Sequence, residues 1–333
     1  MSDINIGLLA ENQNLSEFEI TENFSCIRFL DQNKERFELE FNLEKGTSFN
    51  TFFIRSHEEL FIIHPPEKQY LNSFNKVISR FCNKFKLDKI NFISGHINPQ
   101  IIETIKNIST QFQNTTITCS NPGYKLISEL WNQRNPTLEN FIEIQLPEIN
   151  IIKKELNLEL DNISLELIPI PTARWPGGLI IYERNQEILL SEKIFSAHIA
   201  SADWSETNRA STEIDRKHFY DCLMAPMSNQ VVSITEKIAD YDIKTIAPLH
   251  GPAIEYSLKS FLNDYIRWGE NLSRNNPKIA LIYASAYGNT ASIGDALAKG
   301  INRTSVEVES INCEFTPNDV LVKSIQNADG YLI

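Results

Sequence analysis

Short runs of apolar, β-branched and aromatic residues recur along the first 64 residues and predict strands. The runs cover residues 24–30, 36–43, 48–55 and 59–64. Turn-forming Asp, Asn, Gly and His residues separate them, which is the usual punctuation between strands. This part of the chain is therefore expected to begin with a β-rich segment.

Beyond residue 64 the apolar spacing alternates between the helical period and short buried runs, which predicts helices alternating with strands. Helices are predicted at 67–86, 99–112, 123–133, 212–241 and 256–273. Strands are predicted at 89–94, 115–119, 164–170, 179–182, 188–190 and 245–248. The two halves each combine a β-rich run with βα units, so two packed sheets with helices outside are expected.

A polar, proline-marked stretch at 275–277 is the best domain boundary, because the βα alternation restarts after it. We expect one domain over 1–276 and another over 277–333. The second would hold a strand at 278–284, a helix at 291–301, a strand at 304–311, a helix at 318–326 and the start of a strand at 330–333. A doubly wound domain needs about 100 residues or more, so this one is expected to be incomplete.

Composition narrows the function classes. The net charge of −12 disfavours non-specific binding to nucleic acids or membrane surfaces. The five cysteines are scattered without a Cys-x-x-Cys spacing, which argues against a disulfide framework or a zinc knuckle. The N-terminus lacks the pattern of a signal peptide, and no apolar run is long enough to span a membrane. A cytoplasmic protein without membrane insertion is expected.

One loop has the features of an anion-binding cradle. It lies between the predicted strand 278–284 and the following helix, and it consists of Ser285, Ala286, Tyr287, Gly288, Asn289 and Thr290. A helix N-terminus after a small, hydroxyl-bearing loop favours a phosphate group. The loop is neither a Walker loop nor a dinucleotide-binding glycine motif. A hydroxyl-rich turn without a ligand is the alternative.

Four collinear segments resemble the flavodiiron proteins, also called A-type or diflavin flavoproteins. They are Gly-Thr-Ser-Phe-Asn at 46–50, Gly-His-Ile-Asn-Pro-Gln-Ile at 95–101, Arg-Trp-Pro-Gly at 174–177 and Pro-Leu-His-Gly-Pro at 248–252. The resemblance implies a metallo-β-lactamase-like αββα sandwich, followed by the start of a flavodoxin-like doubly wound α/β domain. It also implies that the loop at 285–290 binds the phosphate of FMN.

The family's metal-ligand positions are largely replaced, as in the cyanobacterial flavodiiron proteins that have lost their iron ligands. These positions correspond to His96, Asn98, Gln100, Ile101, Arg174, Lys193 and His250. The side chains at these positions carry a total charge of about −3 in the family and about +2 in this chain. Like charges about 4 Å apart repel by about 4 kcal/mol at an effective dielectric of 20, so these side chains would repel iron ions. We therefore expect no diiron site. The alternatives are a single metal ion on His96 and His250, or ordinary turn and surface residues in an accidental alignment.

The resemblance implies a subunit of an oxidoreductase that reduces oxygen to water with electrons from NAD(P)H through flavin, in photosynthetic electron flow. It implies a homodimer, or a heterodimer with an iron-bearing homologue, and a small-molecule electron donor. This chain alone is expected to be inactive. A catalytically silent structural or regulatory partner is the alternative, and a metal hydrolase is a weaker one. Trp175 is expected in the core, and His57, His64, His198 and His218 are expected to be structural or surface residues.

Overall fold

The computed structural model of the chain describes residues 7–12, 14–37, 40–41, 43–131, 144–270 and 277–333. The chain divides into two compact units, Met1–Arg267 and Trp268–Ile333. This division falls close to the polar stretch expected as the boundary, and residues 271–276 of that stretch lie outside the described residues. Each unit is described by itself.

The first unit contains two large sheets. One has the strand order β1-β2-β3-β6-β7-β8-β9-β10. Its strands are Gly7–Asn12, Leu15–Thr21, Phe24–Asp31, Thr47–Ser56, Glu59–Ile63, Lys89–Ser94, Thr115–Ser120 and Glu148–Ile152. The pairings are antiparallel as far as β7 and parallel from β7 to β10. The strands β4 (Arg36–Phe37) and β5 (Glu40–Phe41) form a separate small hairpin.

The second sheet has the order β11-β12-β13-β14-β15. Its strands are Leu156–Leu160, Ile163–Pro169, Leu179–Glu183, Ile188–Glu192 and Thr245–Pro248. Apolar side chains from both sheets form one buried cluster, which includes Phe52 and Ile93 from the first sheet and Leu165, Ile181 and Leu190 from the second. The two sheets therefore pack face to face, and this contact forms the central core.

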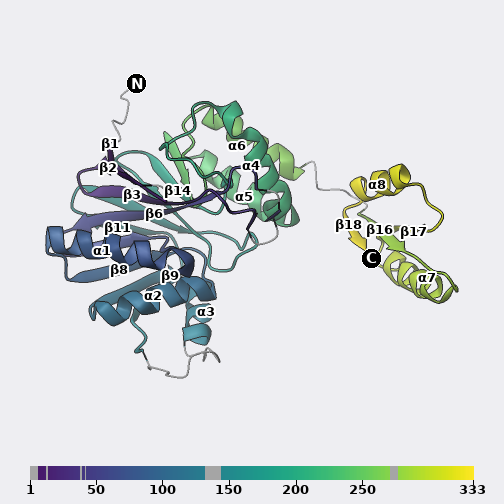
Figure 1. Cartoon of the computed structure of the whole chain (residues 1–333), viewed down its shortest axis with the longest axis horizontal. Coiled ribbons are helices and arrows are strands. Elements are labelled where there is room, and N and C mark those ends of the chain that lie inside the picture. Colours follow the sequence, from purple (N-terminus) through teal and green to yellow (C-terminus); the bar gives the residue numbers. More distant parts are fainter. Residues whose placement is uncertain (1–6, 13, 38–39, 42, 132–143, 271–276) are drawn as a thin grey trace. The chain divides into compact units, whose positions relative to one another are not determined.

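Helices cover the outer faces of the sheets (Figure 1). The helices α1 (Leu71–Phe85), α2 (Pro99–Gln111) and α3 (Asn121–Trp131) bury apolar residues against the first sheet, in a cluster that includes Phe74, Ile105 and Ile127. The helices α4 (Glu213–Phe219), α5 (Ser228–Ala239) and α6 (Leu258–Glu270) lie on the side of the second sheet. The predicted αββα arrangement is confirmed.

Several predicted elements differ in detail. The single helix expected over 212–241 is broken into α4, a π-helical turn at Tyr220–Met224, a 3₁₀ turn at Ala225–Met227 and α5. Pro226 lacks the backbone N–H that a continuous helix needs, which explains the interruption. The strand expected over 36–43 is the short β4–β5 hairpin. The strands β1, β2, β10 and β11 were missed because their sequences are rich in Glu and Asn and lack a continuous apolar run.

The second unit is a small parallel sheet with the strand order β17-β16-β18. Its elements are β16 (Lys278–Tyr283), α7 (Asn289–Asn302), β17 (Glu307–Asn312), α8 (Asn318–Gln326) and β18 (Gly330–Leu332). Ala280, Ile282 and Ile311 form its small core. This order is the one with which flavodoxin-like doubly wound sheets begin. None of the helices in the described part of the chain combines the length and apolar character needed to cross a membrane.

Candidate functional site

Three of the seven predicted ligand positions lie where strands of the two sheets end. His96 follows β8, Lys193 follows β14 and His250 follows β15. All three side chains are buried. The His96 ring lies 6.3 Å from the Trp175 ring, and Lys193 Nζ lies 3.8 Å from the centre of the same ring. The charges of Lys193 and His96 both contribute to lowering the pKa of His250. The fold thus brings together the two retained histidines and places a lysine beside them.

Three other predicted positions belong to the start of α2. Asn98 is the N-cap of this helix, its Oδ1 accepts a hydrogen bond from Ile101 N at 2.9 Å, and Pro99 occupies the first turn. Asn followed by Pro is a favoured way to begin a helix. Asn98 Nδ2 also donates to Glu67 Oε1 at 3.1 Å. Gln100 is exposed, and Ile101 is buried in the core beneath α2. Asn98 and Ile101 therefore have structural roles in or next to α2, whereas Gln100 is exposed to solvent.

His96 contacts a carboxylate that lies outside the family motif. Its Nδ1 is 2.5 Å from Oε1 of Glu192, and both side chains are almost fully buried. Burial alone would raise the pKa of Glu192, but the charge and hydrogen bond of His96, with a smaller contribution from His64, lower that pKa to about 2. The Glu192 side chain therefore remains a carboxylate, and it binds the first histidine of the motif.

The backbone around Glu192 explains how this carboxylate reaches the interior. The pairing of β14 with β15 shifts register between Leu190 and Glu192, and Glu192 has a φ of 58°. A left-handed residue at an irregular strand end interrupts the regular alternation of side chains between the two faces. Glu192 and Lys193 are consequently both buried, although they are neighbours in the sequence.

Lys193 and Arg174 gather around the ring of Trp175. Lys193 Nζ lies 3.8 Å from the centre of the Trp175 ring, and the guanidinium carbon of Arg174 lies 5.3 Å from it. The rings of His96 and Trp175 are 6.3 Å apart. A desolvated cation over an indole face is stabilised by about 2 kcal/mol. Trp175 is half-buried and contacts these cations, so the expectation that it lies in the core is wrong.

His250 is held as a neutral imidazole. Its Nδ1 donates a hydrogen bond to the carbonyl oxygen of Ser48 at 2.8 Å. Burial, the neighbouring His198 and the charge of Lys193 hold the pKa of His250 well below its usual range, although the Ser48 bond opposes them. The rings of His198 and His250 are 5.0 Å apart, and His198 Nδ1 lies 2.7 Å from Thr47 Oγ1.

The other histidines take up two kinds of position. His64 is buried near Glu192, and burial lowers its pKa to about 4. His57 is exposed and lies 3.2 Å from Asp161, and His218 is exposed on α4. His64 and His198 thus border the site, a position that the sequence does not reveal because neither belongs to the family's ligand motif.

Little space remains between the side chains around Trp175, Glu192 and Lys193. A cavity of about 10 Å³ is lined by residues that include Trp175, Glu192, Lys193 and Met224. A cavity of this size holds about one water molecule. The side chains themselves therefore fill most of this region.

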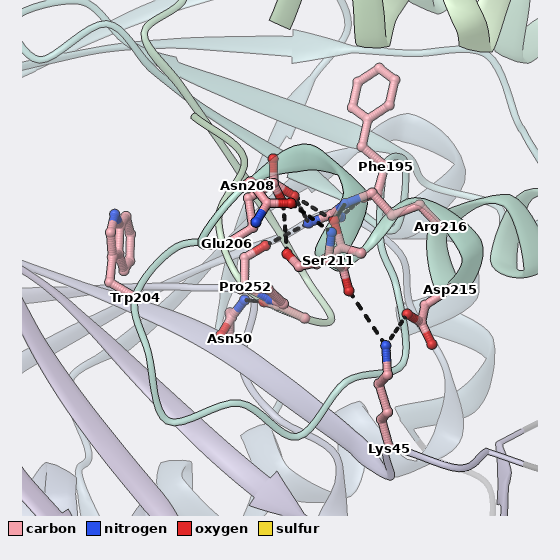
Figure 2. Close-up of polar contacts among 12 residues, drawn as sticks. Lys45, Asn50, Phe195, Trp204, Glu206, Asn208, Ser211, Asp215, Arg216 and Pro252 are labelled. Carbon is pink, nitrogen blue, oxygen red and sulfur yellow. Dashed lines mark hydrogen bonds and ion pairs between the residues drawn. The ribbon is translucent and has the colours of Figure 1, made fainter. Parts of the chain in front are cut away.

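A buried arginine supports the loops around His250. Arg216, on α4, donates to the carbonyl oxygen of Phe195 at 2.5 Å and to that of Pro252 at 3.0 Å, and it lies 3.5 Å from Glu206 (Figure 2). Asn50 Nδ2 donates to the carbonyl oxygens of Pro248 and Gly251 at 2.7 and 2.9 Å. These bonds fix the segment on either side of His250.

Replacing Gly95 with Ala should destabilise the protein. The added Cβ would lie 2.8 Å from Glu192 Cγ and 3.2 Å from the carbonyl oxygen of Leu179. Because His96 holds the Glu192 side chain in place, we expect a loss of about 1–3 kcal/mol in the free energy of unfolding, measured by urea denaturation. Gly300→Ala is the matched control, since a Cβ there meets nothing within 4 Å and should cause no loss. Equal stability of the Gly95→Ala and wild-type proteins would contradict this packing.

The phosphate-loop candidates cover the loop before α7 and the start of its first turn, because α7 begins at Asn289 and not at the predicted residue 291. Ser285 Oγ accepts a hydrogen bond from Ala291 N at 3.1 Å. Gly288 is the N-cap of α7 with a φ of 80°, and it supplies no side-chain cap. Ala286, Tyr287, Asn289 and Thr290 are exposed. The first turn of α7 therefore opens toward this loop.

Comparisons with known proteins agree with this architecture. A family model described as ODP family beta lactamase matches residues 47–251. Diflavin flavoprotein A 5 from Nostoc is 33% identical over 94% of this chain and 53% of its own length. Diflavin flavoprotein A 4 from Synechocystis is 30% identical over 90% of this chain and 48% of its own length. The chain spans about half the length of the curated relatives it matches.

Solved structures give the same result. The metal-soaked Flv1 flavodiiron core from Synechocystis has a TM-score of 0.71 at 29% identity, and the match covers 96% of this chain and 76% of that chain. A fragment, residues 1–254, of diflavin flavoprotein A 5 from Nostoc has a TM-score of 0.67 at 29% identity, with coverage of 78% and 97%.

The packed sheets, the outer helices and the site at the strand ends define a metallo-β-lactamase-like protein. Within this class, the chain belongs to the flavodiiron family, the A-type diflavin flavoproteins.

The side chains at the former ligand positions do not fit two iron ions. Within the described ranges, no group of three or more His, Cys, Asp or Glu side chains is arranged to hold a metal ion. His96 is bound to Glu192, and Lys193 places a cation beside His250. Glu192 was missed because the motif assigns no role to it. The only signal in the sequence is its position next to Lys193.

Proposed function

We propose that this chain is a flavodiiron-type oxidoreductase subunit that lacks its own iron site and acts together with an iron-bearing homologue. The overall reaction would be the reduction of oxygen to water with electrons from NAD(P)H, as part of photosynthetic electron flow. The observation that carries the proposal is the contact between His96 and Glu192 beside the buried Lys193. The family fold is kept here, whereas a buried contact between His96 and Glu192 and the buried Lys193 take the place of the ligand chemistry.

FMN is the cofactor that we propose for the second unit. The donors at the start of α7, together with Ser285, Asn289 and Thr290, suit the phosphate of a mononucleotide. Gly288 gives the loop the left-handed turn that it needs just before the helix. When bound, FMN supplies the transfer of single electrons and of hydride. The residues of this chain bind and orient its phosphate group.

A catalytically silent partner is the second candidate. The specific observation that favours it is the small cavity among Trp175, Glu192 and Lys193, which holds about one water molecule. In this case the chain would contribute a dimer surface, as a homodimer or with an iron-bearing homologue, and no redox chemistry. Both candidates agree on the state of the former metal site and differ in their effect on the partner.

Oxygen uptake separates the two candidates. An iron-bearing flavodiiron homologue would be supplied with NAD(P)H, FMN and a flavin reductase, with and without this chain. We expect this chain alone to add nothing to the uptake caused by free flavin, and to raise the uptake of the iron-bearing protein. Complex formation with unchanged uptake would support the silent partner. Iron-dependent uptake by this chain alone would contradict both.

A further inference from the structure

A cysteine and a histidine meet on the surface of α4, away from the buried site. His218 and Cys222 are four residues apart, so they lie on the same face of the helix. Cys222 Sγ lies 3.8 Å from Nδ1 and 3.7 Å from Nε2 of His218. Cys222 is half-buried and His218 is exposed, so both groups are accessible in the chain.

The local backbone is also unusual. Cys222 lies in the middle of the π-helical turn Tyr220–Met224, which follows α4 directly. Such wide turns are rare and are frequent at functional sites. The nearby charged side chains offset one another, since Lys217 Nζ and Asp221 Oδ1 form an ion pair. The imidazole of His218 is a group within reach of the Cys222 thiol that can accept its proton.

The other cysteines provide a comparison within the same molecule. Cys26, Cys82 and Cys119 are buried, and burial raises their pKa values to about 12, 11 and 12. These thiols are inaccessible and resist ionisation. Cys313 is exposed, but it belongs to the second unit, whose sequence contains no histidine. Only the thiolate is strongly nucleophilic, and an adjacent imidazole favours it by accepting the proton.

We propose that Cys222 is a modification site that forms a mixed disulfide with low-molecular-weight disulfides, and that His218 accepts its proton. The thiol proton passes to His218, and the Cys222 thiolate attacks one sulfur of the disulfide. That S–S bond breaks as the new one to Cys222 forms. The other sulfur leaves as a thiolate and takes up the proton. Cys222 is oxidised, and the low-molecular-weight disulfide that it attacks is reduced by the same two electrons.

The test measures modification at each cysteine of the native protein by 2,2′-dithiodipyridine, a neutral disulfide, with the sites located by peptide mass mapping. We expect Cys222 to react about tenfold faster than Cys313, since thiolate fraction and access set the rate. The His218→Gln substitution should lower the modification rate of Cys222 by about the same factor and leave the modification rate of Cys313 unchanged. Glutathione disulfide should then modify the wild-type protein at Cys222.

Controls keep the result interpretable. The buried cysteines report on folding, because they should react only when urea unfolds the protein. His57→Gln is the matched variant, since it removes an exposed histidine that pairs with Asp161 and lies far from Cys222 in sequence. Equal rates at Cys222 and Cys313, or a rate at Cys222 that does not change in His218→Gln, would overturn the proposal.

Discussion

Replacing Glu192 with Leu should lower the free energy of unfolding by about 1–3 kcal/mol, the usual cost of leaving a buried polar group without its partner. The substitution leaves His96 Nδ1 buried without its acceptor. Glu192→Gln keeps a neutral acceptor and should cost less, which separates the hydrogen bond from the charge. Urea denaturation monitored by circular dichroism measures both variants.

The same contact between His96 and Glu192 predicts that the free energy of unfolding depends on pH. The pKa of Glu192 falls from 4.5 to about 2 on folding, so its stabilising effect is complete above pH 4.5. This stabilisation, about 3 kcal/mol for a shift of this size, should disappear as the pH falls from 4.5 toward 2. The Glu192→Leu and Glu192→Gln variants should not show this loss of stability between pH 4.5 and 2, because neither carries the Glu192 carboxylate.

A surface pair supplies the control for these measurements. Glu155 lies 2.5 Å from Lys237, and both side chains are about half exposed. Glu155→Gln should change the free energy of unfolding by less than about 1 kcal/mol. A Glu192→Leu protein as stable as the wild type would show that the contact with His96 does not hold the site together.

The largest change in ligand binding is expected from replacing the two cations at once. Arg174→His with Lys193→Asp changes the local charge by about −3 and adds two metal-binding side chains beside His96 and His250. Each cation that is removed relieves about 4 kcal/mol of its repulsion with a unit positive charge about 4 Å away, at an effective dielectric of 20. We expect this double variant to bind about one Fe²⁺ or Zn²⁺ per chain.

A neutral double variant separates charge from ligation. Arg174→Gln with Lys193→Asn removes the same cations but adds only weak neutral ligands, so it should bind little metal. Metal content after dialysis would be measured by mass spectrometry of the elements, with circular dichroism as a check on folding. If the folded His/Asp variant gains no metal, the two cations are not what excludes it.

The sequence predicted the architecture because its signals are local. Buried runs such as β8 and β16, and the helical spacing of α1, each identify their own element. The retained His96 and His250 likewise marked the site through short motifs. Their proximity followed from the resemblance to the family.

The remaining features depend on tertiary contacts that no local pattern contains. The burial of Glu192 requires a left-handed residue at the irregular end of β14, and its partner lies 96 residues earlier in the sequence. The cation–π contact of Lys193 depends on the placement of the loop that carries Trp175. By contrast, the helix start at Pro99 was predicted from the sequence, and Asn98 is its N-cap.

On this account, the flavodiiron chain has exchanged its metal ligands for a buried contact between His96 and Glu192 and for the buried Lys193. The most direct test incubates the wild-type chain with Fe²⁺ under anaerobic conditions, removes free metal by desalting and measures the iron per chain. The account predicts no bound iron above the level of a protein that binds none. Two irons per chain would contradict it.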